Sequence, residues 1–206
     1  MNNIKCPFCY GDESKLENKV IFQTKDFKVK PALGELVEGY LMVLPNYHVD
    51  AFSFCSKEDL KKVRILIDKL KQIIYDEYGI VPFVYEHGTG SKSNKFPDSV
   101  THAHIHIIPH QIKDEKEMLD YLQMEKIDSF YDISKLKDEN YFYYENQKGE
   151  MYVKNLYDRK DLRQYFRIQV AKEIGIPDKW QWREHFFMDK IESTVEKLSH
   201  LNKNLD

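Results

Sequence analysis

Three histidines alternate with apolar residues in one short segment of the chain. His102, His104 and His106 stand at every second position of the run Thr-His-Ala-His-Ile-His-Ile-Ile-Pro-His, residues 101–110. Successive side chains of an extended strand point to opposite faces, so a strand here places the imidazoles on one face, each roughly 6.5–7 Å from the next. Imidazole binds metal, moves protons near neutral pH, and attacks phosphorus or carbonyl centres. The segment therefore predicts a site for one of these chemistries.

A Cys-x-x-Cys pair, Cys6 and Cys9, adds a second candidate chemistry near the start of the chain. With Cys55 the cysteine count is odd, and no secretion signal precedes it, which argues against a disulfide framework. Such a pair then indicates zinc or redox chemistry. A thioredoxin-like pair follows a strand and opens a helix, whereas this one lies within the first nine residues, so zinc is favoured.

Length and composition limit the class of protein. The 206 residues make room for one large domain, or one domain with an extension, and the 42% hydrophobic content suffices for a core. A net charge of −3 argues against a general nucleic-acid binder, which needs a basic face. No apolar run approaches the ~20 residues of a membrane helix, and the first residues lack the apolar stretch of a signal peptide. We therefore expect a cytoplasmic protein that has no membrane partner.

Apolar spacing and turn residues predict a mixture of strands and helices around the histidine segment. Ser56 is a helix cap with Asp59 at the third following position, and Gly79 ends that helix. The polar loop 87–99 offers amides, hydroxyls and lysines to phosphate oxygens, although it lacks a Walker A pattern and has a mobile surface loop as its alternative. The expected strands lie within 19–30 and at 40–44, 81–86, 141–145 and 150–154, and the expected helices at 56–78, 115–126, 162–174 and 188–198.

The triplet fits the pattern His-φ-His-φ-His-φ-φ, where φ is apolar, and in this the chain resembles the histidine-triad (HIT) superfamily of nucleotide hydrolases and transferases. The segment 40–48, Tyr-Leu-Met-Val-Leu-Pro-Asn-Tyr-His, resembles the family's strand ending in Pro-Lys-x-His, with Asn46 in place of the lysine. The cysteine pair resembles the zinc-bearing subset. The resemblance covers residues 4–112, and the segment 141–183 resembles an extension found on some bacterial members.

The resemblance implies an α+β fold, with a mainly antiparallel sheet of about five strands, packed helices and commonly a homodimer. Residues 1–112 would form the nucleotide-binding catalytic domain, and residues 113–206 a hairpin and helical extension packed on it. It also implies zinc ligands at Cys6, Cys9, His48 and His102, which make a closed structural site. No organic cofactor is expected.

The resemblance further implies a reaction. His104 attacks the α-phosphorus of a small nucleotide, and the nucleotidyl-imidazole formed passes its nucleotide to water. His106 donates to a phosphate or bridging oxygen, and the Ser99 hydroxyl serves the phosphate and the leaving group. The substrate would be a dinucleoside polyphosphate or a nucleoside phosphoramidate. The alternatives are a transferase or phosphorylase that uses phosphate or a sugar phosphate as acceptor, and a non-catalytic nucleotide-binding or zinc-stabilised interaction protein.

Recognition of the rest of the nucleotide is less well marked in the sequence. The family's ribose-binding Asp, just before 40–44, is not evident, and Glu35 or Glu38 lies near its place. Phe27 and Leu33 are candidates for the base pocket, with ordinary core packing as the alternative.

Four further residues are candidates for binding the phosphate chain. Asn94 and Lys95 belong to the polar loop, which is longer here than in short family members. Gln164 and Arg167 lie on a predicted C-terminal helix, where a solvated helix face is the alternative.

Overall fold

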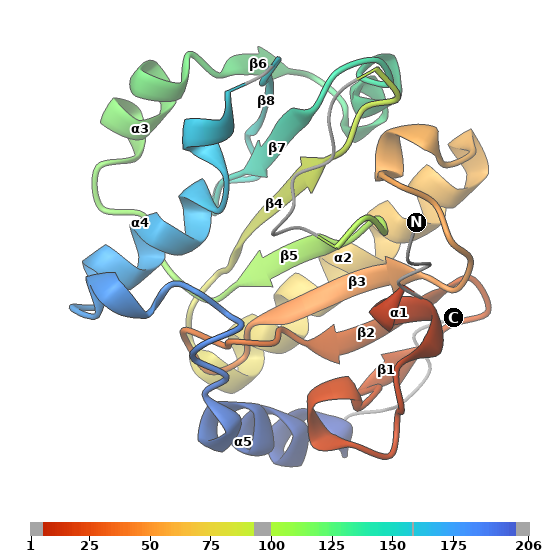
Figure 1. Ribbon diagram of the computed structural model, residues 1–206, viewed down its shortest axis with the longest axis vertical. Helices are drawn as coiled ribbons and strands as arrows, with labels where there is room; N and C mark the ends of the chain where they lie inside the picture. Colours follow the sequence, from red (N-terminus) through yellow and green to blue (C-terminus); the bar gives the residue numbers. More distant parts are fainter. Residues whose placement is uncertain (1–5, 93–99, 158, 201–206) are drawn as a thin grey trace.

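The computed structural model describes residues 6–92, 100–157 and 159–200, and its centre is a single antiparallel sheet (Figure 1). The strand order is β1-β2-β3-β5-β4-β7-β8-β6. The strands are β1 (Phe22–Gln23), β2 (Phe27–Pro31), β3 (Leu41–Pro45), β4 (Phe83–Gly88), β5 (Ile105–Ile108), β6 (Glu125–Ile127), β7 (Tyr141–Glu145) and β8 (Met151–Asn155). The α-helices are α1 (Pro7–Tyr10), α2 (Lys57–Tyr78), α3 (Glu115–Leu122), α4 (Tyr165–Glu173) and α5 (Met188–Ser199). Short 3₁₀ segments lie at Leu16–Asn18, Phe52–Phe54, Phe130–Lys135, Lys160–Leu162 and Pro177–Lys179.

The mainly antiparallel α+β fold is confirmed, but the expected strand number is wrong. Within the described residues the sheet has eight strands rather than about five. The first 112 residues contribute β1–β5, and the C-terminal part adds β6–β8 to the same sheet, because β7 pairs with β4 from Val84↔Glu145 to Gly88↔Tyr141. A second copy in the expected homodimer would therefore have to dock away from this edge of β4.

The helix expected over 115–126 ends early. Gln123 takes a left-handed conformation with φ 53° and terminates α3 after Leu122. The next residues, Glu125–Ile127, pair with β8 as strand β6 instead of extending the helix. A short polar strand of this kind has no alternating apolar pattern by which to recognise it.

Helix α2 covers the back of the sheet in Figure 1 and forms one core with it. Its start and end are as predicted: the Ser56 hydroxyl accepts the amide hydrogen of Asp59, and Gly79 closes the helix at φ 70°. Ala103, Ile105 and Ile107 pack into this core, as the alternation with the histidines predicted. No helix in the described part of the chain combines the length and apolarity that a bilayer span requires.

Helix α4 lies in front of the sheet (Figure 1) and packs in one hydrophobic cluster with Ile108, which shares its face of β5 with His106. Phe166 of α4 packs on the rings of Tyr85 and Tyr144, with ring centroids 4.7 and 5.5 Å away. The C-terminal part of the chain therefore adds strands to the sheet and covers the face of the sheet that carries His106.

A buried ion cluster ties the added strands to helix α2. Glu145, at the end of β7, is only 2% exposed and accepts hydrogen bonds from Arg64 and Lys71 of α2 and from the hydroxyl of Tyr143. Burial alone would raise the pKa of this carboxyl, but the hydrogen bonds and charges of the two cations hold the pKa below its usual range. Glu145 is therefore ionised at neutral pH, and its loss leaves two cations without their shared partner.

We predict that Glu145→Ala lowers the free energy of unfolding by roughly 3 kcal/mol, because removing one partner of a buried ion cluster leaves uncompensated charge. The matched control is Glu125→Ala, at an exposed position on β6, which should change it by less than about 0.5 kcal/mol. Urea unfolding monitored by circular dichroism measures both. Equal, small effects for the two variants would show that the β7–α2 junction is not held by this cluster.

Candidate active site

The three histidines do not lie on one regular strand. Strand β5 begins at Ile105, so only His106 belongs to it. Before it the chain bends: the amide of His102 donates to the carbonyl of Val100 at 2.9 Å, and the amide of Ala103 donates to the carbonyl of Val49 at 2.7 Å. The ring centroids of His104 and His106 remain 4.7 Å apart, whereas the His102 ring faces His48 at 5.2 Å. The triplet therefore divides into a pair and a separate residue.

His104 is held in a defined tautomer by the backbone. Its Nδ1 lies 2.6 Å from the carbonyl oxygen of His102. Because a carbonyl only accepts, Nδ1 carries the proton and Nε2 keeps its lone pair. Burial lowers the pKa of the imidazole, so it is neutral at pH 7. A neutral imidazole with a bare Nε2 is the nucleophilic form.

His106 is connected to two tyrosines. Its Nδ1 lies 2.8 Å from the hydroxyl of Tyr40, which in turn lies 3.0 Å from the hydroxyl of Tyr85. Tyr85 also stacks on the imidazole at 4.3 Å and 8°. If Tyr85 donates to Tyr40 and Tyr40 donates to Nδ1, all three groups are satisfied and the proton of His106 sits on Nε2. Burial holds the pKa of His106 well below its usual value, so it too is neutral.

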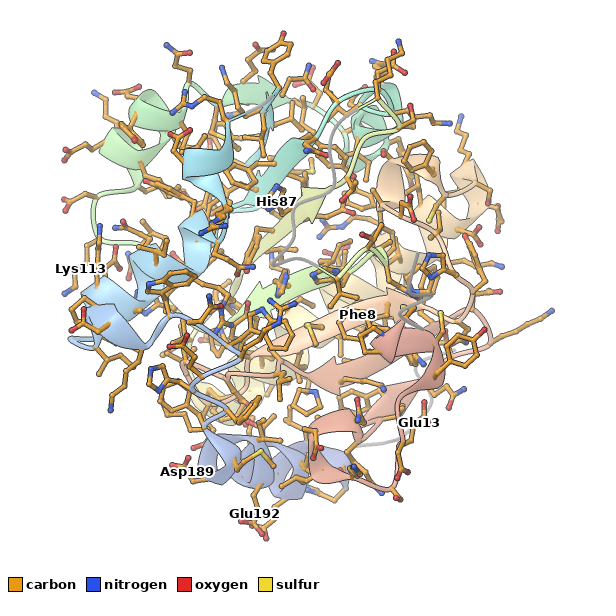
Figure 2. The ribbon with its side chains drawn as sticks, viewed as in Figure 1. Phe8, Glu13, His87, Lys113, Asp189 and Glu192 are labelled. Atoms are coloured by element: carbon orange, nitrogen blue, oxygen red, sulfur yellow. The ribbon has the colours of Figure 1, made fainter. Side chains whose placement is uncertain are left out.

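A fourth imidazole, which sequence reasoning missed, lies beside this pair. His87 follows Tyr85 by two residues on β4, and Tyr85 is the cross-strand partner of His106, so His87 points to the same face. It shares a small cavity with His104 and His106, and burial, aided by the nearby His104, lowers its pKa to about 3. Figure 2 labels His87 and Phe8, which flank His104 from β4 and α1. The signal that could have found His87 in the sequence is its position two residues after Tyr85 on the same strand.

A larger cavity opens in front of His104 and His106. The candidates Leu33, Gln164 and Arg167 all contribute to its wall. The other lining residues are Pro7, Phe8, Glu17, Asn18, Lys30, Ala32, Met42, Val100 and Trp182. Apolar walls with a few convergent polar groups are typical of a small-molecule site.

Arg167 is not on a solvated helix face. It is buried, and its guanidinium donates to the carbonyls of Gly34 at 2.6 Å and Trp180 at 3.1 Å. Its charge also lies 5.7 Å from the ring centroid of Tyr40. Arg167 therefore brings a fixed positive charge to the cavity while it joins α4 to the loop before β3.

Two expectations about the nucleoside end require correction. Phe27 lies in the core between the sheet and α2, stacked on Phe52 at 6.3 Å, rather than in the cavity, because alternation along β2 sends Lys28 and Lys30 to the histidine face instead. Glu35 is fully buried and accepts from the amide of Tyr40 at 3.1 Å and from the hydroxyl of Thr194.

Neither candidate acid takes the place of the ribose-binding carboxylate in the cavity wall. Burial raises the pKa of Glu35 to about 8, and the carboxyl closes the junction with α5. Glu38 accepts from Ser193 at 2.9 Å and pairs with Lys197, both on α5. The positions of this segment that line the cavity are Ala32 and Leu33, neither of which carries a charge.

Cys6, Cys9, His48 and His102 form a candidate metal centre. Their ligand atoms all lie within 4.8 Å of one another. The Sγ atom of Cys9 is 3.4 Å from Nδ1 of both His48 and His102, and Sγ of Cys6 is 3.6 Å from Nδ1 of His102. Ligands on a tetrahedral metal with bonds of 2.0–2.3 Å lie about 3.3–3.8 Å apart. The sequence-predicted ligand set therefore comes together with spacings that suit a bound metal ion.

Both histidines of this cluster have a partner for their second ring nitrogen. Nε2 of His102 lies 3.2 Å from the carbonyl of Pro45, and Nε2 of His48 lies 3.5 Å from the carboxylate of Asp50. Such partners fix the tautomer that leaves Nδ1 bare for a metal. Burial lowers the pKa of His102 to about 4, so its imidazole is neutral, the form that ligates.

The predicted phosphate loop is only partly covered by the structure. Asn94, Lys95 and Ser99 lie outside the described residues. Before them, the amide of Gly90 donates to the side chain of Asn140 at 3.0 Å, and the amide of Ser91 donates to the carbonyl of Lys137 at 2.8 Å. The beginning of the loop is thus fastened to the chain segment that precedes β7.

Comparison with known proteins gives structural matches only. No protein-family model matches the chain, and no curated protein matches it. Several of the solved structures that match are HIT proteins. A member of the HIT family from Bacillus subtilis matches at 22% identity and a TM-score of 0.42, over 53% of this chain and 74% of that one.

Two further matches have similar values. A HIT family protein from Bacillus anthracis matches at 20% identity and a TM-score of 0.37, over 43% of this chain and 60% of that one. A hypothetical histidine triad nucleotide-binding protein from Sulfolobus tokodaii matches at 19% identity and a TM-score of 0.39, over 50% of this chain and 68% of that one. The chain thus spans less than two thirds of the first of these proteins. Its chemistry must be inferred from its own side chains.

We predict that His104 is the neutral Nδ1–H tautomer at pH 7, since its Nδ1 donates to the His102 carbonyl and burial disfavours the imidazolium. Ring ¹⁵N chemical shifts of the histidine-labelled protein measure this directly, with His104→Asn as the variant that assigns the signal. An Nε2–H tautomer, or an imidazolium at pH 7, would contradict the placement of the lone pair.

Proposed function

We propose that the protein is a HIT-type enzyme that hydrolyses a small nucleotide substrate through a covalent nucleotidyl-histidine intermediate. The observation that carries the proposal is the bare Nε2 of His104, fixed by the Nδ1 bond to the His102 carbonyl and set beside the neutral His106 at the cavity wall. Pure binding does not require a nucleophile in this position. The substrate class proposed is a dinucleoside polyphosphate or a nucleoside phosphoramidate.

In the first step, Nε2 of His104 attacks the α-phosphorus and the bond from phosphorus to the leaving group breaks. The leaving group takes the electron pair, and the Nε2–H of the neutral His106 donates a hydrogen bond to it without giving up its proton. Any proton that the departing group takes up comes from the solvent. The nucleotidylated ring of His104 becomes cationic, and the His102 carbonyl, already 2.6 Å from Nδ1, stabilises that charge. With Tyr85 donating to Tyr40 and Tyr40 donating to Nδ1 of His106, Nε2 of His106 carries the proton before the step.

In the second step, water attacks the same phosphorus and releases a proton to the solvent. The bond between phosphorus and Nε2 of His104 breaks, its electron pair returns to the ring, and the nucleoside monophosphate leaves. Two displacements through a good nucleophile lower each barrier relative to one direct attack by water. Phosphate in place of water would give a nucleoside diphosphate, which is the phosphorylase alternative.

We predict that His104→Asn lowers kcat by about three orders of magnitude or more, the scale seen when a catalytic nucleophile is removed. The measurement is turnover against a panel of dinucleoside polyphosphates and nucleoside phosphoramidates, with products identified in the presence and absence of phosphate. His200→Asn, at an exposed position after α5, is the matched control and should leave kcat unchanged. A His104→Asn protein that keeps more than about a tenth of the activity removes His104 from the nucleophile's role.

We further propose that the metal of the Cys6, Cys9, His48 and His102 cluster is zinc. Two thiolates and two imidazoles are a common structural zinc set, and with four protein ligands no position is left for water, so the ion supplies structure rather than chemistry. The cluster joins α1 to the segment that follows β3 and to His102, two residues before His104. Its role would be to fix His102 and thereby the carbonyl that orients His104.

We predict about one zinc per chain in protein purified without added metal. Cys9→Ser should lose most of it and unfold at a lower temperature, because binding free energy of a structural metal is folding free energy. Cys55→Ala, which removes the buried thiol outside the cluster, should keep the zinc. Elemental analysis and thermal unfolding with and without chelator measure both. Less than about 0.2 zinc per chain in the wild type, with no effect of chelator, would rule zinc out.

A further inference from the structure

One lysine in the cavity wall has no hydrogen-bond partner. Lys30 is 2% exposed, and its Nζ makes no hydrogen bond to any described residue. The carboxylate of Glu13 is nearest, at 3.9 Å, and that carboxylate lies closer to Lys28, at 3.4 Å. Lys28 is further satisfied by the carbonyl of Phe8 at 2.8 Å. Of these two neighbouring lysines, only Lys30 is left without a hydrogen bond.

The strand register places Lys30 relative to the histidines. Lys30 on β2 pairs with Met42 on β3, and Met42 pairs with His106 on β5. The three residues form one row across three neighbouring strands, and all three line the same cavity. Two strand spacings separate the backbone of Lys30 from that of His106 by roughly 10 Å. A ligand with its reacting phosphorus at His104 and His106 would therefore reach Lys30 with its other end.

The charge of the cavity favours an anion at that end. Lys30 and Arg167 are the cations of its described wall, and Glu17 is the one carboxylate there. Two of the five donors of Arg167 are used by the carbonyls of Gly34 and Trp180, which hold its guanidinium in place, whereas Nζ of Lys30 donates to no acceptor among the described residues. Lys30 can therefore offer all of its ammonium protons to a ligand.

Burying an ammonium group without a hydrogen-bond partner costs free energy, and most buried polar groups in proteins therefore have such a partner. Glu13 at 3.9 Å is too far to accept a hydrogen bond and is half-exposed. An anionic group of the ligand would supply the missing acceptor, and a charge-assisted hydrogen bond of this kind is among the strong ones. The apolar surfaces of Phe8, Leu33 and Trp182 would cover the part of the ligand between the two ends.

We propose that the substrate carries a second anionic group on its nucleoside portion, distant from the phosphoryl group that His104 attacks, and that Lys30 binds it. This inference rests on the proposed nucleotide chemistry and narrows its substrate class to nucleotides with an additional phosphate or carboxylate. Lys30 is then a specificity-determining residue in the wall of the cavity.

Calorimetric titration with a matched set of probes tests the inference. The probes are a nucleoside 5′-monophosphate, its 2′,5′- and 3′,5′-bisphosphates, and its 3′-O-succinyl ester, each with the four common bases. The proteins are the wild type, Lys30→Met, Lys30→Gln and the control Lys61→Met, which removes the same charge from an exposed position on α2. Thermal unfolding of each variant shows that it is folded, and the neutral Lys30 variants should be no less stable than the wild type.

In the wild type, at least one probe with a second anionic group should have a Kd about tenfold or more below that of the monophosphate. This is the scale of a hydrogen bond to a charged group. That gain should fall below about twofold in both Lys30 variants and persist in Lys61→Met. The 2′-phosphate, 3′-phosphate and succinyl arms identify the group and its position. Binding of the monophosphate with no gain from any second anion, or a gain that survives in Lys30→Met, overturns this inference alone. No binding of any nucleotide overturns both it and the proposed function.

Discussion

The position of His102 is the constraint on which the rest of the site depends. Its side chain belongs to the cluster with Cys6, Cys9 and His48, while its backbone carbonyl accepts the Nδ1 proton of His104. One residue thus links the candidate metal centre to the candidate nucleophile. Loss of the cluster would release the His102 ring, and with it the carbonyl that selects the tautomer of His104. The metal would act on the chemistry only through this geometry.

The C-terminal part of the chain completes the cavity rather than merely lying beside the first five strands. Strand β7 continues the sheet from β4, the strand that carries His87, and Glu145 locks this junction to α2. Helix α4 then brings Arg167 across the front face, where its bonds to Gly34 and Trp180 hold the loop before β3 against the cavity. This layer buries His106 and partly buries His104, and the burial lowers the pKa of both rings.

The sequence predicted the parts of the site that follow from local periodicity and the family resemblance. It did not predict the residues that reach the site through the pairing of distant strands. Alternation correctly sent Ile105 and Ile107 to the core, and the four ligands of the cluster came together as expected. The backbone bend at His102 was not predicted, because it depends in part on the bond from the amide of Ala103 to the carbonyl of Val49, which is distant in the sequence. Lys30 and His87 were missed as cavity residues, since each faces the histidines only through the register of neighbouring strands. The pairing of β7 with β4 was missed for the same reason.

The most direct test of the account is a trapped intermediate. The wild-type protein is mixed with substrate, quenched in alkali within one turnover because acid cleaves a nitrogen–phosphorus bond, digested and analysed by mass spectrometry. The account predicts a nucleoside monophosphate group on the peptide that contains residues 101–110, located on His104 by fragmentation and absent from His104→Asn. Turnover with no labelled peptide under single-turnover conditions, or a label located on another residue, would contradict it.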